Sequence, residues 1–411
     1  MNSDALHTTV KRGRSALLEA QRRARGLASK GNLSAAIPLL RGAVERGLDS
    51  SDDSLHPVIA KCLVTLGSCC IEAGLIDEGM AHLRRAIELD ARNADAYCAL
   101  AYACEQRGLP DVAVEMLREA VRANPRCASA YKSLAGYYLE QQRFDEAIEA
   151  CRRALKLDPG YEPGYVELAM ASERAGDLPQ AAAALEHAIR LDPHNLEYRL
   201  GLARNLATQG QLRDAAEGLR EATRVFPDSV EAHQALGEIC GELGDYGEMI
   251  EQGKALRILS PKNPAAFELL ATGHFQSGQV VEAMDAVRRL VGLEPHEAHH
   301  HLKMGILLQH LGRLGPALEE FMRASSMSSH HDVETAQAAQ EAIANLDDIQ
   351  VRQILLRAAE DQVFRVKLMR DAAATAFSYG FRLSPEALNA LMSMDFELSH
   401  EADQEQPEMY H

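Results

Sequence analysis

The chain has 411 residues, and its 60 acidic side chains against 43 basic ones give a formal net charge of −17. This balance argues against general nucleic-acid binding, which gains affinity by neutralising phosphates with lysine and arginine, so we expect no nucleic-acid partner. No stretch approaches the roughly 18 consecutive apolar residues of a membrane span. The opening Met-Asn-Ser-Asp lacks the basic and then apolar residues with which a signal peptide begins. We therefore expect a cytoplasmic protein without membrane insertion.

Basic residues gather near the N-terminus, where residues 11–30 contain one acidic residue, Glu19. The basic residues there are Lys11, Arg12, Arg14, Arg22, Arg23, Arg25 and Lys30. Two explanations stay open: a basic patch that faces an acidic partner or a membrane surface, and an ordinary solvated first helix. We treat residues 1–16 as a basic N-terminal segment.

From residue 60 onward the sequence repeats with a period of thirty-four residues. Glycine returns at this spacing, with a gap at Gln142, at Gly74, Gly108, Gly176, Gly210, Gly244, Gly278 and Gly312. Proline and alanine keep the same phase at Pro125, Pro159, Pro193, Pro227, Pro261 and Pro295, and at Ala86, Ala120, Ala154, Ala188, Ala222 and Ala324. A shared period of this length indicates an array of repeats rather than one globular core.

Each repeat predicts a helical hairpin. In the unit that opens at Ala94, apolar residues recur at three- and four-residue steps from Tyr97 onward, which lines one face of a helix. Gly108 ends that helix. A second helix follows until Asn124-Pro125, because proline cannot continue a helix and disfavours helix in the residue before it. The recurrent alanines let neighbouring helices approach closely.

The unit resembles the tetratricopeptide repeat, which has this length, an early aromatic residue before Leu-Ala or Leu-Gly, a glycine near the middle and a closing proline. In the unit at Ala128 the matching residues are Tyr131, Leu134, Ala135, Ala147, Ala154 and Pro159. The resemblance implies an all-α fold, a right-handed superhelical solenoid of helical hairpins. We expect eight tandem repeats over residues 60–331, after a degenerate repeat over residues 17–50 and an insertion loop over residues 51–59.

Stacked hairpins line a concave surface with their first helices, so we expect a partner to bind in this groove. Apolar and charged residues alternate on the face of each first helix that lies opposite its packing face. Such a mixture suits an amphipathic helix or an extended peptide of a protein partner. The expected groove residues are Tyr102, Lys132, Leu139, Met170, Arg174, Arg204, Gln234, Glu238, Glu268, Phe275, Ile306 and Gln309. For each of them, ordinary solvent exposure is the alternative.

The segment His296-Glu297-Ala298-His299-His300 spells H-E-x-x-H, the zinc-peptidase pattern, which needs both histidines on one face of a continuous helix. The repeat phase places His296 in the turn after Pro295, so the segment straddles a turn and the start of a helix. His301 occupies the place of the first-helix aromatic residue of other units, which predicts a packing role. We expect no metal site and no cofactor, with His296 and His300 as weak metal-binding candidates.

The eight cysteines form no Cys-x-x-Cys pair. Cys70, Cys104 and Cys240 recur at one place in their repeats, which predicts small buried thiols between the helices. A redox-sensing role of the adjacent Cys69 and Cys70 is the alternative.

Past residue 331 the repeat pattern ends, and we expect a helical segment over residues 332–396. Ser384-Pro385-Glu386 opens its last helix with an N-cap serine, a proline and an early acidic residue. The run from Phe364 to Asp395 is similar to the small subunit of ring-opening extradiol dioxygenases and to leader segments of some ribosomally made, modified peptides. That resemblance implies a docking module, and a cap on the last repeat is the alternative. Residues 397–411 are acidic and predict a disordered tail.

The sequence contains no glycine-rich phosphate loop and no assignable nucleophile set, so catalysis has no visible site. We therefore expect a non-catalytic scaffold for protein–protein interaction that binds a peptide or helix in its concave groove. The alternative is an accessory subunit of a biosynthetic or ring-opening enzyme that docks through residues 332–396. A metal-dependent hydrolase built on the cluster around His296 is a more distant third.

Overall fold

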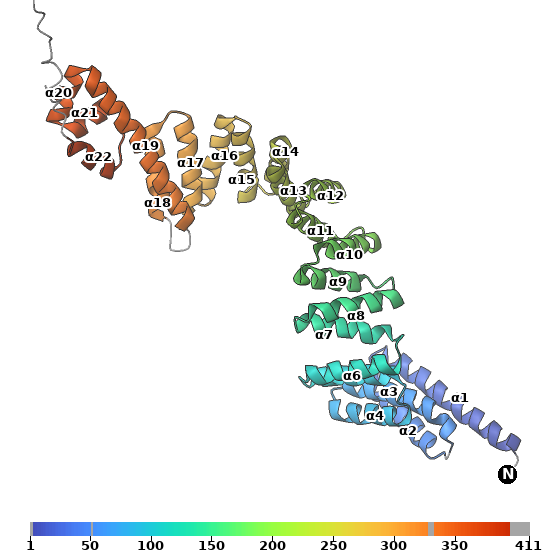
Figure 1. Ribbon diagram of the computed structural model, residues 1–411. Helices are drawn as coiled ribbons and strands as arrows, with labels where there is room; N and C mark the ends of the chain where they lie inside the picture. Colours follow the sequence, from blue (N-terminus) through green and yellow to red (C-terminus); the bar gives the residue numbers. More distant parts are fainter. Residues whose placement is uncertain (1–2, 51, 328–332, 395–411) are drawn as a thin grey trace, which may run out of the picture. The chain divides into compact units, whose positions relative to one another are not determined.

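The computed structural model describes residues 3–50, 52–327 and 333–394, and within these residues it contains helices and turns and no strand (Figure 1). The chain divides between Gln211 and Leu212 into two compact units, which we call unit 1 and unit 2. In each unit, every helix packs on its neighbours in the chain, and the buried side chains lie between them. The expected all-α solenoid is confirmed.

Unit 1 begins with the hairpins α1–α2 and α3–α4 and continues in the same manner to α11. The two helices of each hairpin from α1 to α10 pack on each other, and α3, α5, α7, α9 and α11 also pack on the second helix of the hairpin before them. The helices are α1 (Ser3–Ala28), α2 (Leu33–Leu48), the 3-10 helix η1 (Asp53–Leu55), α3 (His56–Glu72), α4 (Ile76–Leu89), α5 (Ala94–Gln106), α6 (Pro110–Ala123), α7 (Ala128–Glu140), α8 (Phe144–Leu157), α9 (Glu162–Ala175), α10 (Leu178–Leu191) and α11 (Leu196–Thr208).

Unit 2 continues the repeat pattern through α18 and ends with helices of other lengths (Figure 1). The repeat helices are α12 (Leu212–Val225), α13 (Val230–Leu243), α14 (Tyr246–Leu259), α15 (Pro264–Gln276), α16 (Val280–Leu293), α17 (Ala298–His310) and α18 (Leu314–Met327). The C-terminal helices are α19 (Val333–Glu360), α20 (Gln362–Arg370), α21 (Ala372–Ser378) and α22 (Pro385–Met392).

The periodic residues occupy the places that their chemistry requires. The glycines of the ladder have φ between 71° and 85°, a left-handed conformation that ends the first helix of each hairpin. At the gap in the ladder Gln142 adopts the same conformation, with φ 58°, as the only residue other than glycine with positive φ in the described chain. The ladder alanines are all buried, and the ladder prolines each follow the end of a second helix.

The N-terminal hairpin differs from its expected boundaries. Its packing residues are buried as predicted for a degenerate repeat, but α1 begins at Ser3, so the boundary expected at residue 17 lies inside this helix. The loop expected over residues 51–59 is shorter, because α3 already begins at His56 with Pro57 in its first turn. The exposed basic side chains of α1 and the turn after it are Arg12, Arg14, Arg22, Arg23, Arg25 and Lys30.

Histidine replaces the first-helix aromatic residue in some repeats, and it is anchored in the same way each time. His301 is buried, with Nε2 3.1 Å from the carbonyl oxygen of Pro295 and Nδ1 2.6 Å from a carboxylate oxygen of Glu320. His233 contacts the carbonyl of the proline six residues upstream at 3.0 Å and Gln252 at 2.6 Å. The packing role predicted for His301 is confirmed.

The C-terminal helix α19 belongs to two cores. Leu346, in its first half, joins the buried cluster of the last repeats together with Leu308 and Phe321. Ile354, in its second half, joins a separate cluster around Phe364 that also holds residues of α20, α21 and α22. The segment thus covers the last repeat and also carries a small core of its own. The tail expected over residues 397–411 lies outside the described residues.

The start of α22 forms as its sequence predicts. The Ser384 hydroxyl accepts a hydrogen bond from the Ala387 amide at 3.1 Å, which is the N-cap contact. The Ser384 amide in turn donates to the buried Asp347 carboxylate of α19 at 2.9 Å. Ser384 therefore both caps α22 and holds its start against α19.

Candidate functional site

The first helices of unit 1 expose several of the expected groove residues. Tyr102 on α5 and Met170 on α9 have 51% and 54% of their surface exposed. Arg174 and Arg204 are exposed as well. These four side chains are free to contact a ligand on the first-helix face of unit 1.

Two other expected groove residues of unit 1 are engaged within the chain. The Lys132 ammonium lies 2.8 Å from the Asp158 carboxylate and 3.8 Å from the centre of the Tyr161 ring. The hydrogen bond from Lys132 holds the pKa of Asp158 below its ordinary value. Leu139 is half-buried against the core of unit 1. Lys132 therefore links two consecutive hairpins, and less of it is available to a partner than we expected.

In unit 2 the expected groove residues fall into two groups. On α13 the Gln234 amide donates a hydrogen bond to the exposed Glu238 carboxylate at 2.9 Å, so these two side chains contact each other. On α15 and α17, Glu268, Phe275, Ile306 and Gln309 are half-buried. This second group lies between consecutive first helices.

Phe275 of α15 and Ile306 of α17 line a small apolar pocket of about 110 Å³ on the first-helix face. Its other lining residues are Ala271, Thr272, Val287, Lys303 and Leu307. The Phe275 ring meets His310 edge to face, with ring centres 5.1 Å apart. The structure thus brings together two apolar residues that the sequence analysis placed separately in the groove.

The H-E-x-x-H segment does not form a continuous helix. The helix α17 begins at Ala298, and His296 is exposed in the preceding turn, as the repeat phase predicted. His300 is 1% exposed, and it faces two carboxylates rather than His296. Its Nδ1 lies 3.2 Å from Glu268 of α15, and its Nε2 lies 2.9 Å from Glu294 at the end of α16.

The carboxylate of Glu268 is the centre of a charged cluster. Oε1 lies 3.2 Å from His300 Nδ1 and 3.5 Å from His299 Nε2, and Oε2 accepts a hydrogen bond from Lys303. Burial alone would raise the pKa of Glu268, but His300 and Lys303 outweigh it and hold this pKa at about 2. The carboxylate is therefore ionised at every physiological pH.

The two histidines of this cluster are shifted in opposite directions. Burial lowers the pKa of His299, and the positive charges of His300 and Lys303 act in the same sense. Burial also opposes the charged form of His300, but the carboxylates of Glu268 and Glu294 outweigh it and raise its pKa. The sequence analysis assigned Glu268 to the groove and His300 to the zinc pattern, and it did not connect them.

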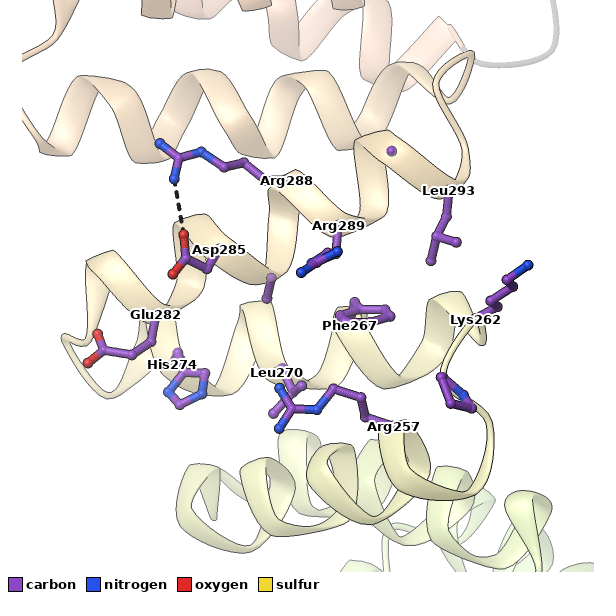
Figure 2. A pocket seen from close by; sticks show the side chains of 13 residues that line it. Arg257, Lys262, Phe267, Leu270, His274, Glu282, Asp285, Arg288, Arg289 and Leu293 are labelled. Carbon is purple, nitrogen blue, oxygen red and sulfur yellow. Dashed lines mark hydrogen bonds and ion pairs between the residues drawn. The ribbon is translucent and has the colours of Figure 1, made fainter.

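The second-helix face of unit 2 carries a cleft that the sequence analysis missed. It has a volume of about 1130 Å³, and its floor includes Phe267 and Leu270 of α15. Figure 2 shows Arg257 of α14 and Arg289 of α16 extending toward this apolar floor. Lys262 and Arg288 also line it, and Arg288 pairs with Asp285 at 3.0 Å.

Three of the four lysine and arginine side chains of this cleft are unpaired within the described chain. Arg257, Lys262 and Arg289 form no ion pair with any described residue. In a chain with a formal net charge of −17, such a group of cations over apolar side chains favours an acidic ligand. Its signal in the sequence is the pair Arg288-Arg289 on α16, which follows Arg257 and Lys262 along the chain.

The thiols follow the expected pattern, with one addition. The cysteines are all free, and Cys70, Cys104 and Cys240 are buried. Burial raises the pKa of Cys70 to about 11, which leaves this thiol protonated and unreactive. Cys98 and Cys127, whose sulfur atoms lie 3.9 Å apart, form a pair that the sequence analysis did not predict.

One stretch of the described chain, Asp53–Glu72, is long and apolar enough to cross a membrane. In the most apolar part of this stretch, 72% is buried inside the structure, as is also found in the core helices of soluble proteins. This stretch includes α3, which packs on both of its neighbouring hairpins.

The fold defines a class of protein, the solenoid of stacked helical hairpins. Family models described as tetratricopeptide repeat match residues 60–93, 98–162 and 172–239. Residues 60–239 of the chain therefore contain tetratricopeptide repeats. The hairpins from α15 to α18 keep the same phase and helix lengths beyond the matched residues.

Among solved structures the chain is similar to YrrB, described as a TPR protein with an unusual peptide-binding site, at 19% identity over 45% of this chain and 96% of that one, with a TM-score of 0.39. It is similar to PilF of Pseudomonas aeruginosa, at 23% identity over 53% and 97%, with a TM-score of 0.36. It is also similar to MamA of Desulfovibrio magneticus RS-1, at 19% identity over 40% and 94%, with a TM-score of 0.38. No curated protein matches the chain.

Proposed function

We propose that this protein is a non-catalytic scaffold that binds a peptide or helix of a partner protein along the first-helix face of its repeats. The tetratricopeptide repeats support this, because stacked repeats present an extended surface built for binding. The exposed apolar side chains Tyr102 and Met170 supply contact area in unit 1. No cofactor, nucleic acid or membrane insertion is part of the proposal.

The observation that carries the proposal is the pocket between α15 and α17. Phe275 and Ile306 converge there from consecutive repeats, so an apolar side chain of a bound segment would contact both. Pockets of this kind, filled by one apolar anchor, supply much of the affinity in protein interfaces. The neighbouring Lys303 adds a polar edge that would fix the orientation of the segment.

Affinity capture with the full chain tests the proposal. We expect the Phe275→Ala/Ile306→Ala variant to bind the captured partner about tenfold more weakly, because truncating anchor residues costs more than 1 kcal/mol. Ile258→Ala is the matched control, since Ile258 is 78% exposed on α14, outside the pocket. Equal binding by both variants, or equal loss, contradicts the proposal. Thermal melts establish that both variants are folded.

A second candidate function is favoured by the surface of the C-terminal helices. On α20 the residues Phe364 and Leu368 face the small core, whereas Val363 and Val366 are exposed. Phe377 on α21 is 65% exposed. An accessory subunit that docks on a catalytic partner through this surface is the alternative function, in keeping with the resemblance of residues 364–395 to docking modules.

Substitutions on α20 separate the two candidates. Val363→Ser/Val366→Ser changes only exposed side chains, so the fold of the module is expected to persist. If the partner docks on the C-terminal helices, the Val363→Ser/Val366→Ser variant no longer binds the partner, and the Phe275→Ala/Ile306→Ala variant still binds it. The opposite result supports the first-helix face.

A further inference from the structure

The cluster around Glu268 places three potential metal ligands together across two repeats. Glu268 lies on α15, and His299 and His300 lie in the first turn of α17. One ligand atom from each residue lies within 4.8 Å of the other two. Glutamate and histidine are among the side chains that bind zinc in proteins.

Two buried atoms of this cluster face each other without a hydrogen-bond partner. They are Oε1 of Glu268 and Nδ1 of His300, 3.2 Å apart. His300 Nε2 is held by Glu294 at 2.9 Å, so when Nε2 carries the proton, Nδ1 presents a lone pair to the oxygen of Glu268. Two acceptors in this position repel each other, and leaving both unpaired is unfavourable. A proton or a cation between them removes the repulsion.

Two spacings between the ligand atoms match a tetrahedral metal site, and all three atoms lie within 4.8 Å of one another. Bonds of about 2.0–2.1 Å at tetrahedral angles separate neighbouring ligand atoms by about 3.3 Å. Oε1 of Glu268 lies 3.2 Å from Nδ1 of His300 and 3.5 Å from Nε2 of His299. Only small movements of the side chains are needed to place one cation in contact with all three atoms.

The surroundings of His300 also suit a ligand. A histidine that binds metal usually gives its other ring nitrogen to a carboxylate, which fixes the ring and its tautomer. Glu294 takes this position, and His300 is 1% exposed.

We propose that Glu268, His299 and His300 bind one divalent cation of the zinc class, which links α15 to α17 on the first-helix face. Three protein ligands leave a fourth tetrahedral position for water or for a carboxylate or imidazole of a bound partner. Of the two histidines of the H-E-x-x-H pattern, only His300 belongs to this site, because His296 lies in the turn before the helix. The proposal goes beyond the scaffold function and stands without it.

A second grouping in the described chain, Cys70 with Glu78 and His82, is a weaker candidate. The carboxylate of Glu78 is already paired with Arg41 and lies 3.3 Å from His82. Burial raises the pKa of the Cys70 thiol to about 11, whereas metal binding needs the thiolate. None of these side chains has a buried atom left without a partner.

Calorimetric titration of Zn²⁺ into the untagged full chain, freed of metal with a chelator, tests the proposal. We expect one equivalent to bind to the wild type. Binding is expected to weaken at least a hundredfold in His299→Ala and in Glu268→Gln, whose side chains are not fully buried. Glu294→Gln is expected to weaken it by about 10- to 100-fold through the orientation of His300. A visible Co²⁺ spectrum of tetrahedral intensity, lost in Glu268→Gln, reports the geometry.

His296→Ala is the matched control, because this histidine is exposed next to the cluster but contributes nothing to it. Circular dichroism establishes that each variant is folded. Absence of one-to-one binding overturns the proposal and leaves a proton shared between His300 and Glu268. Full affinity in Glu268→Gln, or loss of affinity in His296→Ala, overturns it as well. Neither result bears on partner binding at Phe275 and Ile306.

Discussion

At the scale of single residues, Gln142 is the departure from the glycine ladder with a measurable cost. A residue other than glycine destabilises the fold by roughly 1–2 kcal/mol in the left-handed conformation. Glycine avoids this strain, but the larger conformational entropy of its unfolded chain costs roughly 0.4–1 kcal/mol. We expect Gln142→Gly to stabilise the protein by about 0.5–1 kcal/mol, measured by urea unfolding.

The reciprocal change at Gly176 is the control for this prediction. An added Cβ at Gly176 meets no atom within 4 Å, so Gly176→Gln changes only the backbone preference. It is expected to destabilise the protein by about 1 kcal/mol. If both substitutions shift stability in the same direction, the conformational explanation is wrong.

Residues with a single possible role were predictable from the sequence, and residues whose role depends on a neighbour were not. A glycine that recurs at a helix end has one physical reason, positive φ, and the structure has it at each such place. Glu268 and His300 lie on different helices, and their contact depends on the rotamers of both side chains. Periodicity specifies which helix faces meet, and it does not specify which polar atoms are left unpaired.

At the scale of helices, the ladder glycines and prolines mark the ends of the repeat helices, whereas Pro38 lies inside α2 and Gly67 lies inside α3. The helix α19 shows the opposite case: residues 333–360 contain neither glycine nor proline, and they form one helix through a change in hydrophobic pattern. The start of α1 was missed for a related reason, because the apolar pattern begins only near Leu17 while the helix extends to Ser3. Helix ends without a stop residue need the packing to define them.

Polar contacts between second helices make the stability of unit 2 depend on pH. Arg220 of α12 contacts both carboxylate oxygens of Glu248 on α14, at 2.9 and 3.0 Å from Nε. The hydrogen bonds from Arg220 lower the pKa of Glu248 against the effect of burial. A carboxyl group whose pKa is depressed by folding stabilises the protein above its unfolded pKa, and this contribution disappears as the pH falls through the folded pKa.

We therefore expect Glu248→Gln to cost up to about 1 kcal/mol at pH 7, a modest value because Arg220 is partly exposed to solvent. The difference from the wild type is expected to shrink as the pH falls below 4.5, the ordinary pKa of a glutamate side chain. Urea midpoints at neutral and acidic pH measure it. Glu282→Gln, which removes an exposed carboxylate, should show no such pH dependence. A pH-independent cost at position 248 would refute the ionic explanation.

At the scale of the whole molecule, the repeat architecture could be predicted from the sequence. The cleft on the second-helix face of unit 2 and the pocket on its first-helix face could not. The cleft on the second-helix face forms where Ala286 and Gly292 leave space above Phe267 and Leu270. Its volume depends on how far apart neighbouring second helices stand, and small residues alone do not determine that distance. The first-helix face was predictable as a surface, and its pocket became visible only when Phe275 and Ile306 were placed together.

A solenoid couples each repeat mainly to its neighbours, so damage to one repeat stays local. Ala154 is buried in α8, between α7 and α9 of unit 1, and the close packing there leaves no room for a larger side chain. We expect Ala154→Leu to cost about 1–3 kcal/mol through overpacking. Hydrogen exchange should accelerate in α7, α8 and α9 and stay unchanged in α15 to α18 of unit 2. Ala175→Leu, at an exposed position of α9, should leave both regions unchanged. Faster exchange throughout both units would show instead that the array unfolds as one cooperative body, and wild-type stability would mean that this alanine does not set the helix spacing.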